Sequence, residues 1–423
     1  MNHTKIKAIK ETLKIEKAVK KILDKIEFPE LTSEFVPIEE ALGRILAENL
    51  KSPKEIPQFD KSAVDGYAVV AENTFGASLT NPLILRKVGQ VKTGDMDTPE
   101  VKDGEVVLLY TGSRVPKGAN AVLMLEYTNI IDNEKIEIHA SVAPGQNVSK
   151  SGEDVKSGEL ILKKGTRLKP QDLGMLVALG LTKVEVLKKP KIALLSTGSE
   201  LIPPGSEDTL GRTIDVNRII ISSMARVLGA EVIDLGIAKD DVDEIKSKIK
   251  EGIAKGDLII VTGGTSVGDT DLTLDAINSI DKPQALVHGI SIRPGKPTGL
   301  AILKNKFIAS LSGYPVAAMI GFEALVKPIL IKMMGIFEDP TPIIRAKLTR
   351  RITSPLGEKN YVRVRVEKSD GEFLAYPVRS TGSGIISSMI RANGFLIIPE
   401  DREGIDEEEM VEILLFRPID EVI

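Results

Sequence analysis

The sequence of 423 residues contains no cysteine and only three histidines, His3, His139 and His288. The absence of cysteine excludes disulfides, zinc ribbons, iron–sulfur ligation and thiol catalysis. The scattered histidines argue against a multi-histidine zinc site. No nucleophile-elbow motif accompanies His139 or His288, which argues against a Ser-His-Asp enzyme. Any bound metal is therefore expected to have oxygen ligands, which indicates magnesium or a similar cation.

Long apolar runs and an excess of basic residues are also missing. No apolar run reaches the ~18 residues that a membrane helix needs. The lysine-rich N-terminus lacks the apolar segment of a signal peptide. The net charge of −4 and the pI near 5.7 argue against a nucleic-acid-binding protein, which usually carries a basic stripe. The sequence thus predicts a cytoplasmic protein that binds neither membranes nor nucleic acid.

The length and the changes of pattern along the chain predict four parts rather than a single core. Residues 1–58 and 154–189 form a helical and extended linker domain, with helical spacing over 13–26 and more briefly over 38–50. Residues 59–153 form an inserted β-rich domain of short strands between turns. Residues 336–423 form a C-terminal domain that resembles a β-barrel.

Residues 190–335 are predicted to be an α/β domain. Strands at 192–196, 231–236, 258–262 and 307–311 alternate with helices at 218–228, 242–254, 272–280 and 317–334. Such alternation predicts a doubly wound, mostly parallel sheet with helices on both faces. Ligands bind beyond the carboxyl ends of the strands in these sheets.

Two glycine-rich loops follow these strands. Thr197-Gly198-Ser199-Glu200 follows the first strand, and Gly263-Gly264-Thr265-Ser266 follows 258–262. Backbone N–H groups in such loops can close on phosphate oxygens. Neither loop matches a Walker or GxGxxG motif, so it does not indicate those nucleotide sites. Tight strand–helix turns are the alternative interpretation.

Charged side chains are expected at the same edge of the sheet. Carboxylates beside a phosphate cradle can hold magnesium, although helix N-capping also explains several of them. The Arg293-Pro294-Gly295-Lys296-Pro297 segment supplies cations that could pair with phosphate or an oxyanion, or could form a solvated surface turn. The acids are Glu200, Asp240, Asp241, Asp269 and Asp271.

A further pair of acids lies in the segment from Pro57 to Ala68, Pro-Gln-Phe-Asp-Lys-Ser-Ala-Val-Asp-Gly-Tyr-Ala. Asp60 and Asp65 stand on a loop too polar to be core. Carboxylates there are either turn formers or working ligands.

This segment and a series of later motifs resemble the molybdopterin molybdenumtransferase family, which includes the cofactor-synthesising domain of gephyrin. The resemblance covers nearly the whole chain, and the motifs occur in the family's order. The later motifs are Thr111-Gly112, Gly152-Glu153-Asp154, Ser196–Leu201, Asp215-Val216-Asn217, Gly263–Asp271, Pro294–Pro297, Gly313–Val316 and Thr381-Gly382-Ser383.

The resemblance implies an elongated homodimer, with residues 1–58 and 154–189 as linker and dimerisation domain. It implies magnesium-dependent hydrolysis of adenylyl-molybdopterin, insertion of molybdate or tungstate into the dithiolene, and release of AMP. The molybdopterin adenylyltransferase and acceptor apo-enzymes are implied as further partners. Since the substrate carries the sulfur that holds molybdenum, the protein needs no cysteine for it.

The resemblance also assigns roles to individual residues. Asp65, which would complete the site across the dimer interface, is catalytic together with Glu200, Asp240 and Asp271. The last three also serve as metal ligands. The residues that would bind the substrate are Thr111, Asp154, Thr197, Gly198, Gly263, Gly264, Ser266, Arg293, Lys296 and Ser383.

The chain departs from the family pattern at four positions. Gly289 aligns with a lysine, Ser149 with a frequent arginine, Tyr314 with a frequent asparagine and Ser312 with a proline. These departures raise the hypothesis of a lineage that handles tungstate. Two other functions stay open from sequence alone, a molybdopterin adenylyltransferase and a non-catalytic scaffold on the same fold.

Overall fold

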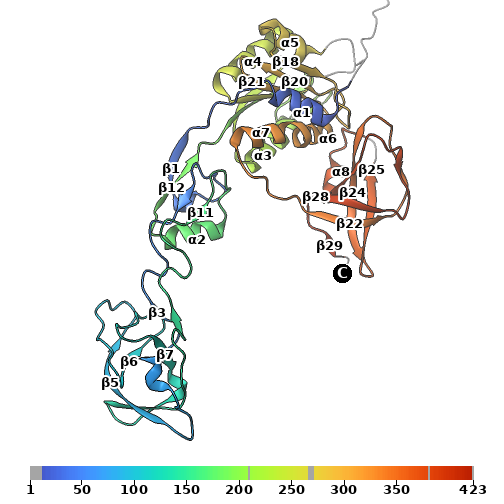
Figure 1. Cartoon of the computed structure of the whole chain (residues 1–423). Coiled ribbons are helices and arrows are strands. Elements are labelled where there is room, and N and C mark those ends of the chain that lie inside the picture. The colour runs from blue at the N-terminus through green and yellow to red at the C-terminus, as the bar shows by residue number, and fades with distance from the viewer. Residues whose placement is uncertain (1–11, 208–209, 265–270, 380–381, 422–423) are drawn as a thin grey trace, which may run out of the picture. The chain divides into compact units, whose positions relative to one another are not determined.

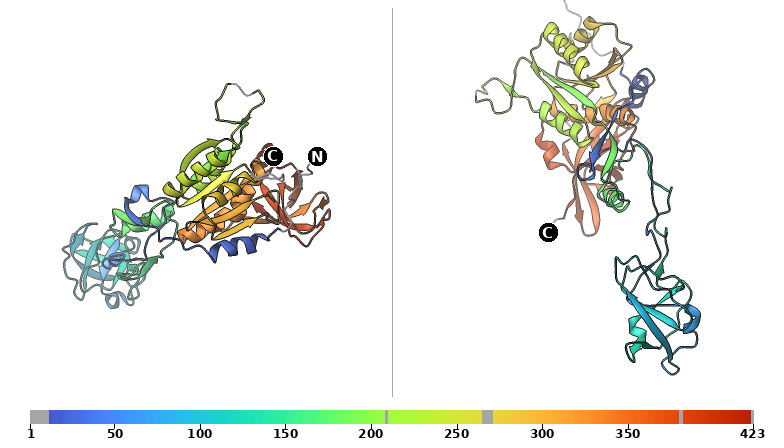
Figure 2. Two further views of the ribbon diagram at one scale, coloured as in Figure 1. Left: turned by 90° about the horizontal axis from the view of Figure 1, so that it is seen from above. Right: turned by 90° about the vertical axis from the view of Figure 1, so that its left-hand side faces the viewer.

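The computed structural model describes residues 12–207, 210–264, 271–379 and 382–421. The chain divides into two compact units (Figure 1, Figure 2). The first unit contains residues 12–35, 43–45 and the chain from Glu185 onward. The second contains residues 36–42 and 46–184. Strands β1 (Ser33–Pro37) and β12 (Lys183–Leu187) lie where the chain passes between the units.

The second unit contains the predicted β-rich domain. Its six-stranded sheet has the order β7-β4-β6-β5-β9-β8, and its pairs are antiparallel except β5 with β6. Tyr67, Val69, Ile136 and Ile138 are buried in its core. The strands are β4 (Gly66–Val69), β5 (Leu83–Val91), β6 (Glu105–Leu109), β7 (Ala121–Met124), β8 (Thr128–Ile130) and β9 (Lys135–Ile138).

The rest of this unit is more extended than its spacing predicts. The helix expected over 38–50 is wrong beyond the single turn η1 (Ile38–Glu40). Gly43 has φ +72°, and Leu46 exchanges backbone hydrogen bonds with Gly165 and Thr166. Tertiary pairing therefore overrides the local pattern. The remaining elements are β2 (Leu50–Lys51), β3 (Lys61–Ser62), η2 (Ala71–Thr74), η3 (Leu125–Tyr127), β10 (Val148–Ser149), β11 (Leu160–Leu162) and α2 (Pro170–Ala178).

The first unit contains a six-stranded sheet in the order β16-β13-β17-β21-β20-β18. The first four strands are parallel and the last two join antiparallel, which confirms the mostly parallel sheet. The sequence reading missed β18 and β20, which are short apolar runs near prolines. The strands are β13 (Lys191–Thr197), β16 (Glu231–Ala238), β17 (Leu258–Thr262), β18 (Ala285–His288), β20 (Gly299–Leu303) and β21 (Lys306–Leu311).

Helices cover both faces of this sheet (Figure 1). Ile192 and Leu194 of β13 pack toward α1, α3, α6 and α7, whereas Ala193 and Leu195 pack toward α4 and α5. The predicted long helix runs from α6 through the π-turn η4 to α7, and Gly335 ends it at φ +62°. The helices are α1 (Ile15–Leu23), α3 (Asn217–Val227), α4 (Val242–Lys255), α5 (Leu272–Ile280), α6 (Pro315–Gly321), η4 (Phe322–Val326) and α7 (Lys327–Met334).

The C-terminal part of the first unit is a closed β-barrel. The path β24-β25-β22-β28-β26 returns to β24, which closes the ring. Val362, Val364 and Val366 face the core, but Arg363 on the alternate face is also buried, at 1% exposure. The strands are β22 (Ile343–Leu348), β24 (Lys359–Ser369), β25 (Glu372–Arg379), β26 (Gly394–Ile398) and β28 (Met410–Leu415).

Shorter elements complete this unit. They are β14 (Leu201–Ile202), β15 (Thr213–Ile214), β19 (Ile292–Arg293), β23 (Ile352–Thr353), α8 (Ser387–Arg391), β27 (Gly404–Ile405) and β29 (Asp420–Glu421). Across the described ranges, no helix is long and apolar enough to span a membrane.

Candidate functional site

A cleft of about 710 Å³ opens in the first unit beyond the carboxyl ends of the parallel strands. The loops after β13, β16, β17 and β21 line it, together with two residues from the barrel domain, Glu358 and Ser383. Nine of the predicted site residues line this one cleft. They are Thr197, Gly198, Glu200, Asp240, Gly263, Gly264, Arg293, Lys296 and Ser383.

Glycines let the two strand-end loops approach each other closely. Gly263 has φ +92°, and a Cβ there would lie 2.2 Å from the backbone oxygen of Thr197. Gly264 has φ +66°, and its Cβ would lie 2.6 Å from the hydroxyl of Thr273. Only glycine satisfies such positions without strain. The tight turns are therefore confirmed, and phosphate binding by their backbone N–H groups stays a prediction.

Two of the predicted acids stand together on these loops. The N–H of Ser199 donates to Oδ2 of Asp240 at 2.9 Å, and the N–H of Asp240 donates to the Ser199 hydroxyl at 3.1 Å. This reciprocal pair joins the loop after β13 to the loop after β16. The side chains of Glu200 and Asp240 line the cleft and belong to exposed residues. Helix capping falls instead to Asp241, whose Oδ1 accepts from the N–H of Glu244.

Asp271 occupies a different environment from Glu200 and Asp240. Its Oδ1 accepts from the N–H of Leu274 at 3.0 Å, which makes it the N-cap of α5. Its Oδ2 lies 3.3 Å from Nε2 of His288. Burial raises the pKa of the Asp271 carboxyl. Asp271 is not among the residues that line the cleft.

The predicted metal ligands are thus only partly assembled in the described chain. No group of three His, Asp or Glu side chains converges within residues 12–207, 210–264, 271–379 and 382–421. The predicted residues Ser266 and Asp269 lie outside those ranges. Metal ligation by Glu200, Asp240 and Asp271 stays a prediction.

The cationic loop is held by the rest of the fold. Residues Ile292 and Arg293 of β19 pair with the start of β24. The Gly295 carbonyl accepts from the Thr298 hydroxyl at 2.7 Å, and the Lys296 carbonyl accepts from the N–H of Ile290 at 2.9 Å. Nζ of Lys296 lies 3.0 Å from Oε1 of Glu358. The backbone of this loop is therefore held by the fold and Lys296 has an ion-pair partner, whereas binding of phosphate or an oxyanion by Arg293 and Lys296 stays a prediction.

The barrel also contacts the cleft through Ser383. The carbonyl of Ser383 accepts from the N–H of Val316 at 3.0 Å, which joins the barrel domain to the first turn of α6. The side chain of Ser383 is thereby carried to the same cleft as the glycine loops.

The lining residues that were not predicted as site residues from the sequence include Asp215, Asn217 and Glu358. Nδ2 of Asn217 donates to the Gly313 carbonyl at 2.8 Å, which fixes Oδ1 as a buried acceptor. In the described chain, Oδ1 of Asn217, Oδ2 of Asp215 and Oγ1 of Thr197 are buried without a hydrogen-bond partner. Oδ2 of Asp215 does lie 3.5 Å from Nε of Arg218.

These buried oxygens suit a ligand that brings hydrogen-bond donors, because buried acceptors are normally paired. The Asp215-Val216-Asn217 motif was a signal that could have assigned two of them. Glu358 has no such signal, since it lies 62 residues from the lysine that it contacts.

The second unit contains the remaining predicted site residues. Oδ1 of Asp65 accepts from the N–H of Thr111 at 2.6 Å and from its hydroxyl at 2.7 Å. These bonds hold the pKa of the Asp65 carboxyl below its usual range, although the residue is exposed. Gly66 is required beside it, because a Cβ there would lie 2.2 Å from the Leu123 carbonyl oxygen.

The other acids of this unit differ from Asp65. Asp60 pairs with Nζ of Lys150 at 2.7 Å and accepts from the N–H of Ser151 at 2.9 Å, so it organises a turn. Asp154 is exposed, and its N–H donates to the carbonyl of Ile56 at 3.0 Å. Of the two acids in the segment from Pro57 to Ala68, Asp65 is thus the one whose carboxylate is held by hydrogen bonds and belongs to an exposed residue.

Comparison with known proteins shows the family of this chain. Three family descriptions match the chain in order: "MoeA N-terminal region (domain I and II)" over residues 13–180, "Probable molybdopterin binding domain" over 193–332, and "MoeA C-terminal region (domain IV)" over 345–416. The chain belongs to the MoeA family. It is an enzyme of molybdenum cofactor biosynthesis, of the molybdenumtransferase class.

Individual relatives of this MoeA-family chain extend over nearly its full length. It is 37% identical to a putative molybdopterin biosynthesis protein of Methanocaldococcus jannaschii, over 97% of this chain and 100% of the relative. It is 34% identical to the molybdopterin molybdenumtransferase of Bacillus subtilis, over 91% and 90%. The solved MoeA structure of Pyrococcus horikoshii covers 96% of this chain and is itself fully covered, with a TM-score of 0.83 at 37% identity.

Proposed function

We propose that this enzyme hydrolyses adenylyl-molybdopterin in a magnesium-dependent reaction, releases AMP, and inserts molybdate or tungstate into the dithiolene. The observation that carries the proposal is the single cleft in which glycine loops, a cationic loop and sheet-edge carboxylates meet. Backbone N–H groups and the Arg293 and Lys296 side chains would bind the phosphates and the oxyanion.

The charge of the described cleft lining supports the need for a divalent cation. Two cationic side chains, Arg293 and Lys296, face four acidic ones, Glu200, Asp215, Asp240 and Glu358. A polyanionic substrate entering such a cleft needs added positive charge.

The donors present fit magnesium, which takes one or two carboxylates together with phosphate oxygens and water. Glu200 and Asp240 are the exposed carboxylates that would hold it. When bound, the ion would neutralise charge on the phosphate being cleaved.

We extend the proposal to a homodimer in which Asp65 of one subunit acts at the cleft of its partner. Asp65 and Thr111 belong to the second unit, whereas the cleft residues belong to the first. The carboxylate of Asp65 is held ionised by Thr111, which suits a group that positions a cation or a water molecule.

The direct test is release of AMP from adenylyl-molybdopterin by the purified protein with magnesium, in the presence and absence of molybdate. We expect release that depends on molybdate, with the metal retained on the pterin. Tight binding of the adenylate without release would contradict the proposal and favour adenylyl transfer or a scaffold function. Molybdate and tungstate insertion measured side by side would decide the preferred oxyanion.

A further inference from the structure

The cleft contains an ion pair that competes with the proposed ligand. Lys296, from the cationic loop, contacts the carboxylate of Glu358 at 3.0 Å. Glu358 comes from the barrel domain, immediately before β24, so the pair joins two domains across the cleft lining. Lys296, which is proposed to bind an anionic ligand, is therefore already paired with a carboxylate of the protein.

The backbone on both sides of this pair is fixed. Lys296 is held through its carbonyl by Ile290. On the other side, the N–H of Gly357 donates to the Glu400 carbonyl at 2.7 Å, and the N–H of Lys359 donates to the Ser291 carbonyl at 2.9 Å. Only the side chains of Lys296 and Glu358 are free to separate.

The two side chains are accessible enough to separate easily. The Lys296 side chain is 45% exposed and the Glu358 side chain 20%. Partly exposed ion pairs contribute little to stability, because water solvates both partners once they are apart. A phosphate or molybdate with two negative charges attracts the ammonium group more strongly than a single carboxylate does.

We infer that Glu358 is a specificity-determining residue that holds Lys296 in the unliganded cleft and yields it to a doubly charged oxyanion. When the anion leaves, Glu358 recaptures the lysine and so promotes release of the product. The exchange also disfavours weakly charged ligands, which cannot displace the carboxylate. This inference rests on the proposed function for the identity of the anion, AMP or molybdate.

The test is calorimetric binding of AMP, inorganic pyrophosphate and adenosine to the full chain with magnesium at low salt. Glu358→Gln keeps a hydrogen-bond acceptor but removes the competing charge. We expect it to bind AMP and pyrophosphate about fivefold more tightly than the wild type. Adenosine, which carries no phosphate, should bind with unchanged affinity. Glu358→Asp should restore weaker AMP binding.

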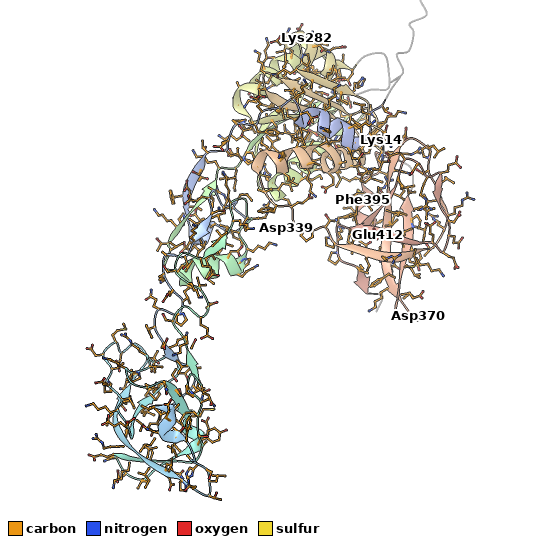
Figure 3. The ribbon with its side chains drawn as sticks, in the orientation of Figure 1. Lys14, Lys282, Asp339, Asp370, Phe395 and Glu412 are labelled. Atoms are coloured by element: carbon orange, nitrogen blue, oxygen red, sulfur yellow. The ribbon has the colours of Figure 1, made fainter. Side chains whose placement is uncertain are left out.

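Two controls separate this exchange from a general charge effect. Glu412→Gln removes a charge from an exposed barrel residue outside the cleft, labelled in Figure 3, and should leave AMP binding unchanged. In a Lys296→Gln background, Glu358→Gln should lose most of its gain, because the lysine it releases is gone. An equal gain in both backgrounds would overturn the inference.

The remaining outcomes distinguish the two proposals. If the wild type releases AMP from adenylyl-molybdopterin but Glu358→Gln binds AMP and pyrophosphate no more tightly, the exchange is wrong and the proposed reaction stands. If Glu358→Gln tightens pyrophosphate binding but no AMP is ever released, the reaction is wrong and the exchange stands. If Glu358→Gln binds neither AMP nor pyrophosphate, the exchange is also wrong.

Discussion

At the scale of single residues, the cleft depends on glycine where neighbouring backbone leaves no room for a Cβ atom. Gly263 and Gly205 both have positive φ, +92° and +85°. A Cβ at Gly263 would meet the Thr197 carbonyl oxygen at 2.2 Å, whereas no atom lies within 4 Å of a Cβ at Gly205. The two positions therefore separate backbone strain from steric contact.

We predict that Gly263→Ala lowers stability markedly more than Gly205→Ala. Strain of about 1–2 kcal/mol from the left-handed backbone is common to both substitutions, and only Gly263→Ala must also displace backbone. Thermal denaturation of the two variants measures the difference. Equal losses of melting temperature would show that the two loops do not pack as closely as described.

Glu200 allows a test of chemistry apart from folding, because it is exposed and lines the cleft. We expect Glu200→Gln to lower AMP release by at least about 100-fold with an unchanged melting temperature, as expected for lost electrostatic stabilisation. Glu231→Gln is the matched control, since Glu231 is also exposed but begins β16 at the opposite edge of the sheet. Normal turnover by Glu200→Gln would remove this residue from the site.

At the scale of elements, residues 12–16, which extend into the first turn of α1, connect the residues just before the cationic loop to the barrel. The N–H of Leu13 donates to the Gly289 carbonyl at 3.1 Å, and the Leu13 carbonyl accepts from the N–H of Ser291 at 2.8 Å. Lys14 pairs with Glu400 at 2.8 Å. Glu16 pairs with Lys359. We call residues 12–16 the strap; its contacts show how a distant segment supports the cleft.

The strap predicts a pH dependence of stability. The hydrogen bond from Lys359 lowers the pKa of Glu16, and that from Lys14 lowers the pKa of Glu400. A lowered pKa in the folded state stabilises the protein above the ordinary glutamate value of 4.5. This stabilisation is lost as the pH falls through the lowered pKa. The strap should therefore hold at neutral pH and loosen in acid.

Thermal denaturation from pH 7 down to pH 3 would measure this effect in a Lys14→Met, Lys359→Met variant. We expect the variant to melt below the wild type at pH 7 and the difference to shrink below about pH 4.5. Lys20→Met, which removes an exposed pair with Asp24 at the C-terminal end of α1, should have a smaller effect. If the difference in melting temperature between variant and wild type is the same at pH 3 as at pH 7, the two ion pairs do not stabilise the strap.

At the scale of the whole molecule, the predicted catalytic acids belong to different units. Asp65 is in the second unit and Glu200 in the first. In the proposed dimer, a mixed pair of Asp65→Asn and Glu200→Gln subunits has one site with both acids intact if each site takes Asp65 from the partner.

We predict that each variant alone is inactive and that the mixed dimer, purified with two different affinity tags, regains up to about half of the wild-type AMP release. The control for arrangement is the double variant Asp65→Asn, Glu200→Gln mixed with wild type. This dimer has no complete site if each site takes Asp65 from the partner, but one complete site if both acids come from the same subunit. An inactive mixed dimer of the single variants would contradict sharing of the site between subunits.

The parallel part of the α/β domain was predictable because its four strands, β13, β16, β17 and β21, alternate with helices along the chain. The antiparallel strands β18 and β20 were not predicted, since no helix separates β20 from β21. The barrel strands were predictable from alternation, as with Val362, Val364 and Val366. Prediction failed over 38–50, where a helical spacing is overridden by pairing with residues 165–166. Spacing cannot report a partner that lies more than a hundred residues away.

The sequence by itself determined the family, the fold class and nine of the residues that line the cleft, because strand ends converge in a parallel sheet and the motifs stand at those ends. Only the tertiary structure decided the states of individual groups. Asp271 lies against His288, Asp65 is bound by Thr111, and Lys296 is held by Glu358. The two partners in each pairing are far apart in the sequence. They come into contact only when the chain folds, so the pairing cannot be predicted from sequence spacing.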